Sequence, residues 1–331
     1  MASSKTWKLG VAAALIAAAV AAFLLLHRAG RGEMELLELL PPDLDLYAVA
    51  DLQSLRAIPA VQKWLADPPG LHHDAEYDDF LRATGFRYQD DLHLVALGKT
   101  GDDWVGAARA HIDRARVTPY LDSQGAGKKD VSGRTVYTFG SIRPFRLVLL
   151  DDRPEGSLVA FTIGGDDSRI RQEIARRAGD LRDSAASELD RGDDRKHIPP
   201  GSKFWLIARP ERFGGNDEKE AQFGSLGLSR GMLKGSKTVY ISLQGGPAQL
   251  ELRAEDYCDS PASAQRITGT LRAILALLRA MPPEKSAAGK PASLSPAVAL
   301  AGIELDQAQQ SVVLRWRLDS AVLSLLESYL H

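Results

Sequence analysis

The run KTVYISLQGGPAQLELRA (residues 237–254) decides the architecture of this chain. Apolar residues recur at every second position from Val239 to Leu243, the residues Gln244-Gly245-Gly246-Pro247 supply a turn, and the alternation resumes at Leu250. Two alternating runs joined by a glycine-rich turn predict an antiparallel hairpin that buries one face. We therefore expect an antiparallel sheet in the second half of the chain.

The same patterns recur along the chain. A period of two residues indicates strands, and apolar residues spaced by three or four indicate helices. The expected strands are residues 43–51, 92–97, 104–112, 135–139, 145–150, 158–163, 203–209, 299–305 and 311–318, and the main expected helices are 54–66, 168–181, the stretch from Ser260 to Pro282, and 320–330.

The helix expected at 168–181 has the clearest signals. Ser168 is the expected cap, and apolar and basic residues alternate with helical spacing. The expected buried stripe is Ile170, Ile174, Ala178 and Leu181, and the expected basic outer face is Arg169, Arg171, Arg176 and Arg177.

The order of elements divides the chain into two halves with a similar plan. Residues 43–182 and 202–331 each read as strand, helix, two strands, helix, further strands and helix, and the charged segment 183–201 separates them. Hairpins outnumber strand–helix–strand crossovers, which favours antiparallel sheets. We predict an α+β fold of two tandem halves that share one plan and are candidates for a repeat, with helices packed on one face of each sheet.

One apolar segment precedes both halves. Leu9 to Leu26 is eighteen residues without a charge and is flanked by Lys5 and Lys8 before and by Arg28 and Arg31 after. As a helix it would reach roughly 27 Å, enough to cross a thin bilayer. We expect a cytoplasmic tail (1–8), a transmembrane signal anchor (9–26) and a juxtamembrane stalk (27–42). Cleavage of the segment and the opposite orientation are the alternatives.

Charge and cysteine content narrow the function classes. The chain has 41 basic and 43 acidic residues, and without the four residues that flank the anchor the balance is 37 to 43. This negative body argues against nucleic acid as a partner. The single cysteine, Cys258, cannot form an internal disulfide, and no nearby histidine would activate it as a nucleophile.

Several stretches resemble a known group of proteins. They are the opening Leu40-Pro41-Pro42-Asp43 through Tyr47, Asp51, Leu55 and Pro59, the strand Gly133-Arg134-Thr135-Val136-Tyr137, and the closing strand Val312–Leu318. They are similar to bacterial signal-anchored extracytoplasmic proteins built from tandem α+β repeats, to which no activity is assigned. The resemblance implies an anchored α+β body and supplies no catalytic residue.

Short catalytic and metal-binding patterns fail in their context. Gly227-Leu228-Ser229-Arg230-Gly231 has the spacing of a nucleophile elbow, but Gly235-Ser236 interrupts the helix that should follow the serine. His72-His73-Asp74, with Glu76, Asp78 and Asp79, has no second ligand cluster elsewhere and is interpreted as an acidic helix start.

Two glycine-rich stretches and one tripeptide fail in the same way. Gly125-Ala126-Gly127-Lys128-Lys129 lacks the glycine and hydroxyl spacing of a phosphate-binding loop, and the carboxylates of Gly164-Gly165-Asp166-Asp167 would occupy the position of an anion. Arg191-Gly192-Asp193 is interpreted as part of a solvated linker.

These observations favour a non-catalytic protein. We expect a single-pass protein of the inner membrane whose bulk lies in the periplasm and whose body binds a protein partner in the cell envelope, without catalytic residues, cofactor or metal. A carrier of lipid or another apolar ligand, held between the sheet and the helix that contains Ile267–Leu278, is the alternative. A hydrolase is the second alternative.

Overall fold

In a computed structural model, the described residues are 32–59, 61–62, 75–124, 127–213, 222–223, 228–229, 234–246, 249–280 and 300–323. The expected tail (1–8) and anchor (Leu9–Leu26) lie outside these ranges. Within them, the search for a helix long and apolar enough to cross a membrane finds none.

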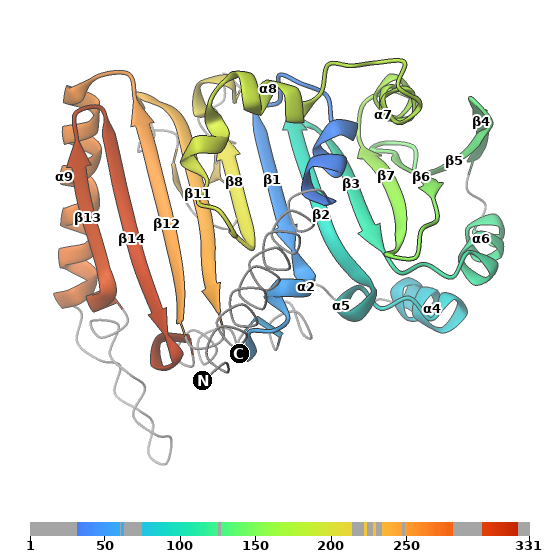
Figure 1. The fold of residues 1–331 in the computed structure, drawn as a ribbon, viewed down its shortest axis with the longest axis horizontal. Helices are drawn as coiled ribbons and strands as arrows, with labels where there is room; N and C mark the ends of the chain where they lie inside the picture. The colour runs from blue at the N-terminus through green and yellow to red at the C-terminus, as the bar shows by residue number, and fades with distance from the viewer. Residues whose placement is uncertain are drawn as a thin grey trace, which may run out of the picture.

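Twelve strands form one antiparallel sheet, in the order β13-β14-β12-β11-β8-β1-β2-β3-β7-β6-β5-β4 (Figure 1). This large antiparallel sheet with its helices confirms the mixed α+β class. The strands are β1 (Leu46–Asp51), β2 (Leu92–Thr100), β3 (Asp103–Ala110), β4 (Gly127–Val131), β5 (Arg134–Phe139), β6 (Phe145–Asp151), β7 (Ser157–Ile163), β8 (Phe204–Ala208), β11 (Ser236–Gly246), β12 (Gln249–Cys258), β13 (Ile303–Ala308) and β14 (Ser311–Asp319), and a separate pair joins β9 (Gln222–Phe223) to β10 (Leu228–Ser229).

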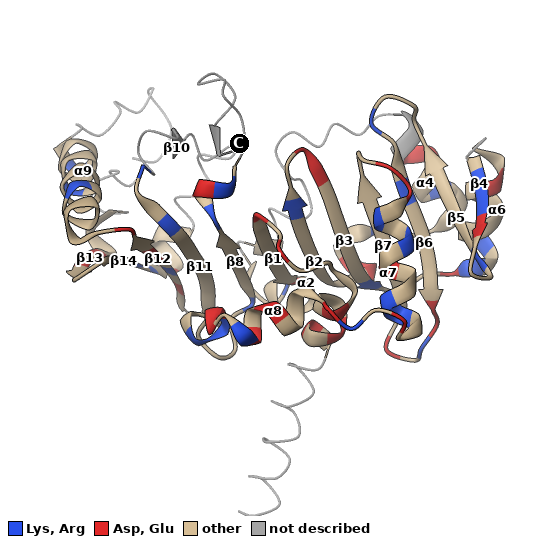
Figure 2. Ribbon diagram, turned by 90° about the horizontal axis from the view of Figure 1, so that it is seen from above, with Lys and Arg blue, Asp and Glu red and all other residues tan. Residues whose placement is uncertain are grey.

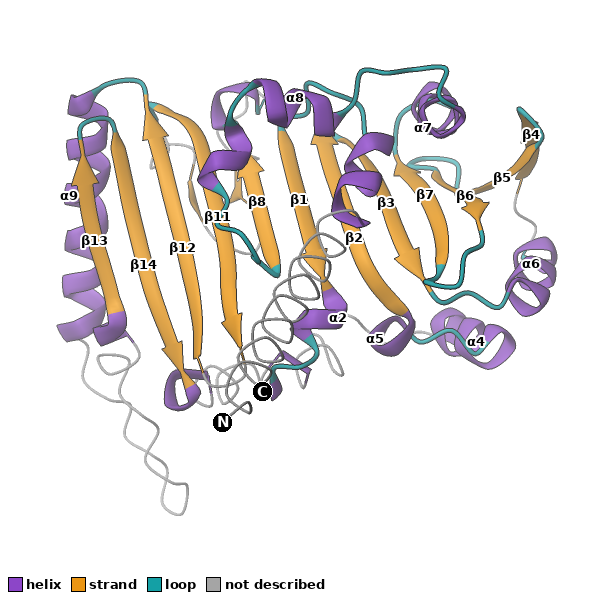
Figure 3. Ribbon diagram, in the orientation of Figure 1, coloured by secondary structure: helices purple, strands orange, loops and turns teal. Residues whose placement is uncertain are grey.

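Helices connect the strands and pack beside them (Figure 3). Residues 32–39 are helical and lead into β1. The further described helices are α2 (Leu52–Leu55), α4 (Ala75–Thr84), α5 (Tyr88–Asp91), α6 (Arg114–Ser123), α7 (Ser168–Ala178), α8 (Ala185–Arg191) and α9 (Pro261–Ala280), with the 3-10 turns η1 (Asp194–His197), η2 (Pro210–Arg212) and η4 (Leu300–Gly302).

One face of the sheet, which we call the front face, is covered by helix 32–39, α7 and α8 (Figure 2). Its core takes every second residue of the central strands, because side chains alternate between the two faces of a strand. The front-face core includes Leu36, Leu37, Leu40, Tyr47, Val49, Ala96, Ala107, Val148, Ala160, Ile170, Ile174, Leu189, Trp205 and Ile207.

The expected stalk (27–42) is, from residue 32, an element of this core. The side chains of Leu36, Leu37 and Leu40 have no solvent exposure. Full burial of a leucine side chain contributes about 1.5–3 kcal/mol. Hydrophobic packing therefore fixes the helix to the body, where the sequence predicted a separate spacer.

Three further expectations differ from the structure. The expected linker 183–201 contains α8 and η1, because Ala185, Ala186 and Leu189 enter the front-face core. No strand was expected between residues 112 and 135, yet β4 lies there and forms an edge of the sheet. Helix α7 ends at Ala178, since Gly179 adopts a left-handed conformation, and Leu181, expected in the buried stripe, is 41% exposed.

Helices also pack on the opposite face, which we call the rear face. Helix α9 packs on β12 and β14 through Ala264, Ile267, Cys258 and Val312, and α6 covers Tyr137, Phe139 and Leu147 at the other end of the sheet. The expectation of helices on one face is therefore wrong. Both faces of central strands such as β1 are apolar, and α9 and α6 cover the rear face at the two ends of the sheet.

Strands β1 and β8 pair antiparallel at the centre of the sheet. Outward from this pair, the order is β1-β2-β3-β7-β6 on one side and β8-β11-β12-β14-β13 on the other. In each series a helix, α6 or α9, follows the third strand along the chain. The two series are thus topologically equivalent about the centre, and the first half adds β5 and β4.

Local features repeat at equivalent positions. Pro41-Pro42 precedes a positive φ at Asp43 (59°), and Pro199-Pro200 precedes a positive φ at Gly201 (78°). The hairpins β2·β3 and β11·β12 are each irregular in the first residues of their leading strand, between Leu92 and Leu94 and between Ser236 and Thr238. Bulges are specific features of a strand pair, so their recurrence strengthens the equivalence.

Candidate functional site

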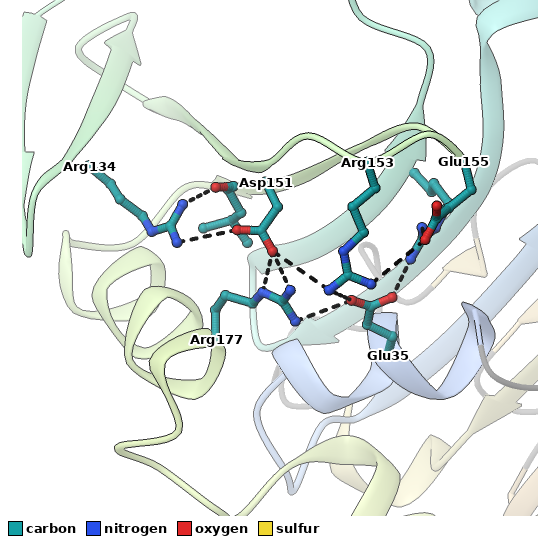
Figure 4. A network of polar contacts seen from close by, with 8 residues as sticks. Glu35, Arg134, Asp151, Arg153, Glu155 and Arg177 are labelled. Carbon is teal, nitrogen blue, oxygen red and sulfur yellow. Dashed lines mark hydrogen bonds and ion pairs between the residues drawn. The ribbon is translucent and has the colours of Figure 1, made fainter.

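A cluster of ion pairs joins helix 32–39 to the first half of the sheet (Figure 4). Glu35 contacts Arg109 through one carboxylate oxygen, and its other oxygen lies 3.0 Å from Arg153 and 3.2 Å from Arg177. The Arg109 side chain is 9% exposed and that of Glu35 is 17% exposed. A buried guanidinium needs such a partner, so this Glu35 cluster holds the helix in register on the sheet.

Asp151 extends the Glu35 cluster to α7. It accepts a hydrogen bond of 2.7 Å from Arg177 Nε and lies 3.3 Å from Arg134. Burial acts to raise the pKa of the Asp151 carboxyl, but the hydrogen bond and charge of Arg177, together with Arg134, outweigh it and keep this pKa below its usual value. Asp151 is therefore a charged partner of arginine at neutral pH.

The helix before β1 and the helix before β8 each bind an aromatic residue of the other half. Glu33, in the helix before β1, accepts a hydrogen bond of 3.2 Å from Trp205 Nε1 of β8. Glu188, in the helix before β8, accepts a hydrogen bond from the Tyr47 hydroxyl of β1. Each carboxylate also has an arginine partner, Arg195 at 2.9 Å from Glu33 and Arg209 at 3.2 Å from Glu188. This reciprocal exchange ties the two halves together.

Asp194 continues this network into the second half. It accepts hydrogen bonds of 2.9 Å from Arg209 and 2.7 Å from the Tyr240 hydroxyl, and the His197 ring stacks on Tyr240 with 4.4 Å between ring centres. Burial and the hydrogen bond to Asp194 raise the pKa of Tyr240, and burial and the bond to Glu188 raise that of Tyr47. Both phenols stay protonated as hydrogen-bond donors, which suits a structural role.

One buried carboxyl group is left without a partner. Glu173 of α7 is fully buried, and neither of its oxygens has a hydrogen-bond partner among the described residues. Burial raises its pKa well above the usual value, against the smaller effect of Arg176. The neutral acid is therefore the form that the folded protein favours.

The rear face of the central strands forms a continuous apolar surface, which we call the rear apolar face. The registers of β11, β8, β1, β2, β3, β7 and β6 place its residues side by side. Its half-buried apolar members include Ile241, Leu206, Ala48, Leu97, Val95, Trp104, Phe161, Ile163, Phe145 and Leu147. A contiguous apolar surface of this kind is typical of a site that binds a partner or ligand.

The motifs that the sequence singled out are not brought together by the described structure. Leu228 and Ser229 form the short strand β10, whereas an elbow places its serine between a strand and a helix. His72, His73 and Asp74 lie outside the described residues, and Asp79 pairs with Arg82. Within the described ranges, no group of three or more His, Cys, Asp or Glu has metal-binding geometry.

The glycine-rich motifs have local structural roles. Gly127–Lys129 belongs to β4, and Lys129 lies 2.8 Å from Asp167. Asp167 also pairs with the buried Arg146 at 2.8 Å, and Asp166 accepts a hydrogen bond from the Ser168 backbone. Carboxylates therefore occupy the start of α7: Asp167 stands at the N-cap position without a side-chain cap hydrogen bond, Asp166 accepts from the backbone, and Ser168 is the first helical residue. Asp193 of the Arg-Gly-Asp tripeptide pairs with Lys196.

Sequence reasoning missed the ion-pair clusters and assigned two residues differently. Arg177, expected on a solvated basic face, is part of the Glu35 cluster, and Arg176 donates a hydrogen bond to the carbonyl of Asp183. Cys258 is fully buried, and burial followed by the charge of Asp256 raises the pKa of its thiol to about 12. The sequence signal for these ion-pair clusters was the glutamates of residues 32–39. A carboxylate in a leucine-rich helix that packs on a core needs a charged partner.

No protein-family model and no curated protein matches the sequence. Solved structures of TP0453 match most of the chain. Crystal form III of TP0453 has a TM-score of 0.50 at 11% identity and covers 88% of this chain and 98% of that chain. Crystal form I has a TM-score of 0.46 at 10% identity and covers 88% and 96%. At this identity the similarity concerns the fold alone.

Proposed function

We propose that this chain is a membrane-anchored, extracytoplasmic binding or scaffold protein of the cell envelope. Residues 9–26 are its transmembrane anchor, residues 1–8 are cytoplasmic, and the bulk lies in the periplasm on the inner membrane. The observation that carries the proposal is the burial of helix 32–39, which begins six residues after Leu26. A body attached so closely to its anchor is held at the membrane surface, where a partner can be recruited.

The finer architecture belongs to the same proposal. The two halves, 43–182 and 202–331, are related repeats that follow the transmembrane helix. The equivalent strand orders, the two Pro-Pro turns and the two irregular hairpins support this relation. A doubled body offers a large, rigid surface for a partner, as expected of a scaffold.

A second candidate is a carrier of an apolar ligand. The rear apolar face favours a carrier function. Large apolar side chains at the centre of this face, such as Leu97 and Leu206, are only half-buried. Helix α9 contributes further half-buried apolar side chains in its second half, at Leu271, Ile274, Leu275 and Leu278. An apolar ligand would cover both.

Protease shaving of spheroplasts tests the anchored topology. A protease added outside the inner membrane should digest the body of the full chain and leave a fragment that contains residues 1–26. Protection of the body in intact spheroplasts, with digestion after lysis, would place it in the cytosol and refute the proposal. Crosslinking in cells should capture an envelope protein, and turnover of a substrate without any captured partner would contradict a binding role.

A further inference from the structure

The rear apolar face has an unusual composition. Three consecutive rear-facing residues from each of its strands are apolar or glycine, with one exception, Lys99 in β2. The set is Leu46, Ala48, Ala50, Val95, Leu97, Lys99, Trp104, Gly106, Ala108, Phe145, Leu147, Leu149, Val159, Phe161, Ile163, Phe204, Leu206, Ala208, Val239, Ile241 and Leu243.

Side chains on the front and rear faces of the same strands differ in their exposure to solvent. On β1, the front-facing Tyr47 and Val49 are 0% and 3% exposed. Of the rear-facing residues, Ala48 is half-buried, Ala50 is half-buried against the cluster that contains Leu55 and Ile58, and Leu46 is 8% exposed. On β7, the rear-facing Phe161 is half-buried beside the fully enclosed Ala160. The rear apolar face therefore retains apolar area that a ligand can remove from water.

Lys99 is the one charged residue of this surface, and no described carboxylate neutralises its ammonium group. Its register neighbours are Leu46 on one side and Trp104 on the other, followed by Ile163 and Phe145. Its ammonium group lies 5.5 Å from the centre of the Phe213 ring, and no carboxylate pairs with it among the described residues. A ring attracts a cation without cancelling its charge.

Lys128 provides an internal comparison. Its ammonium group also lies over an aromatic ring, 5.9 Å from the centre of Tyr137, but Asp122 pairs with it at 2.5 Å. At the end of the sheet that α6 covers, the protein itself thus supplies the anion. At Lys99 no described carboxylate takes this part, which leaves the position open to the anion of a bound molecule.

We propose that the rear apolar face binds the anion of a long-chain fatty acid, with its carboxylate at Lys99 and its alkyl chain on the neighbouring apolar rows. The inference rests on the second candidate function. The row from Lys99 to Phe145 crosses three strand spacings, about 14 Å, and Val95 lies about 13 Å along β2, so either direction accommodates a long chain. A single ammonium group matches a carboxylate of one charge.

Titrating the chain from Gly32 onward, which keeps every described element, with palmitate and with hexadecanol tests this assignment. The two probes share an alkyl chain and differ in charge. Palmitate should bind at least tenfold more tightly than hexadecanol, since a charge-assisted hydrogen bond is added. Lys99→Met should remove that advantage and leave hexadecanol binding within about twofold, whereas Lys128→Met should leave both unchanged.

The possible results separate the two levels of the proposal. If the wild-type chain binds neither probe, both the fatty-acid assignment and the apolar-carrier function are refuted. Equal affinity for the two probes, or a Lys99→Met variant that keeps the preference for palmitate, would refute the assignment of Lys99 while the apolar carrier stands. Leu97→Asn should weaken the binding of both probes to the same degree. An unchanged affinity would mean that the alkyl chain of the probe binds elsewhere on the protein.

Discussion

The two halves of the sheet share a strand order and differ in the face that they bury. In the first half, helix 32–39 and α7 cover the front face, α6 covers the rear face only at its outer strands, and rear-facing residues nearer the centre such as Val95 and Leu97 are half-buried. In the second half, α9 and residues 322–323 pack on the rear face, and the front of β12 and β14 carries charged residues such as Arg253, Arg315 and Arg317. The comparison shows that strand topology does not dictate which face becomes the core.

Residues that lie outside the two equivalent strand series decide which face becomes the core. The front face of the first half is closed by the helix that follows the expected anchor, and Glu35 pairs there with Arg109. The front charges of the second half pair across exposed strands, as in Arg317 with Glu304 at 3.7 Å. Breaking matched interactions in the two halves therefore measures how unequal they are.

The largest effect is expected at Glu35. Glu35→Gln would leave the buried Arg109 with only Glu155, whose side chain is 55% exposed, and we expect a loss of about 3 kcal/mol in the free energy of unfolding, the low end of the cost of breaking a buried ion pair. Urea denaturation monitored by tryptophan fluorescence provides the measurement. The matched control is Glu304→Gln in the second half, where both partners are about half exposed and the loss should stay below about 1 kcal/mol. Equal losses would contradict the comparison.

The next effect concerns the helices of the two halves. Ile174→Ala in α7 removes a side chain that is 2% exposed, and we expect a cost of about 2–5 kcal/mol. Leu278→Ala in α9 removes a half-buried side chain, so its cost should be less than half as large. Thermal unfolding of both variants compares them, and a larger cost for Leu278→Ala would show that α9 is the better packed helix.

A smaller effect is expected from the exchanged aromatic residues. Tyr47→Phe removes the hydroxyl that donates to Glu188, at about 1.5–3 kcal/mol for a hydrogen bond to a charged group. Trp205→Phe removes the donor to Glu33 and some ring volume. Because the two bonds use different carboxylates, a double-mutant cycle should give costs that add within about 0.5 kcal/mol. An interaction free energy above this value would mean that the two hydrogen bonds depend on each other and that the two halves unfold together at this junction.

The smallest effect, counted per pH unit, is a pH dependence that originates in α7. The pKa of Glu173 is raised in the folded state, so the unfolded chain releases this proton at a lower pH than the folded chain does. Stability from this group is fully present below the unfolded pKa of about 4.3 and falls as pH rises, by about 1.4 kcal/mol per pH unit, until the folded pKa is reached. Glu173→Gln should remove that slope in urea titrations between pH 4 and 7. An unchanged slope would assign it to other groups.

Local sequence patterns predicted the strands of the hairpins well. Val239–Leu243 and the return through Leu250 form β11 and β12, and the run at 311–318 lies within β14, because alternation and turn residues act over short distances. The ion-pair clusters were not predictable in this way. Glu35 and Arg177 are far apart in the chain, and their spacing carries no period that would indicate contact.

The sequence by itself determined the class of the protein: an α+β body of hairpins with a negative charge, preceded by an apolar segment of membrane-spanning length. Only the tertiary structure decided that β1 and β8 join both halves in one sheet, that helix 32–39 is core rather than stalk, and that helices cover both faces. The physical reason is that alternation and helical spacing are local properties. Strand neighbours and the choice of buried face depend on the surfaces that distant segments bring with them.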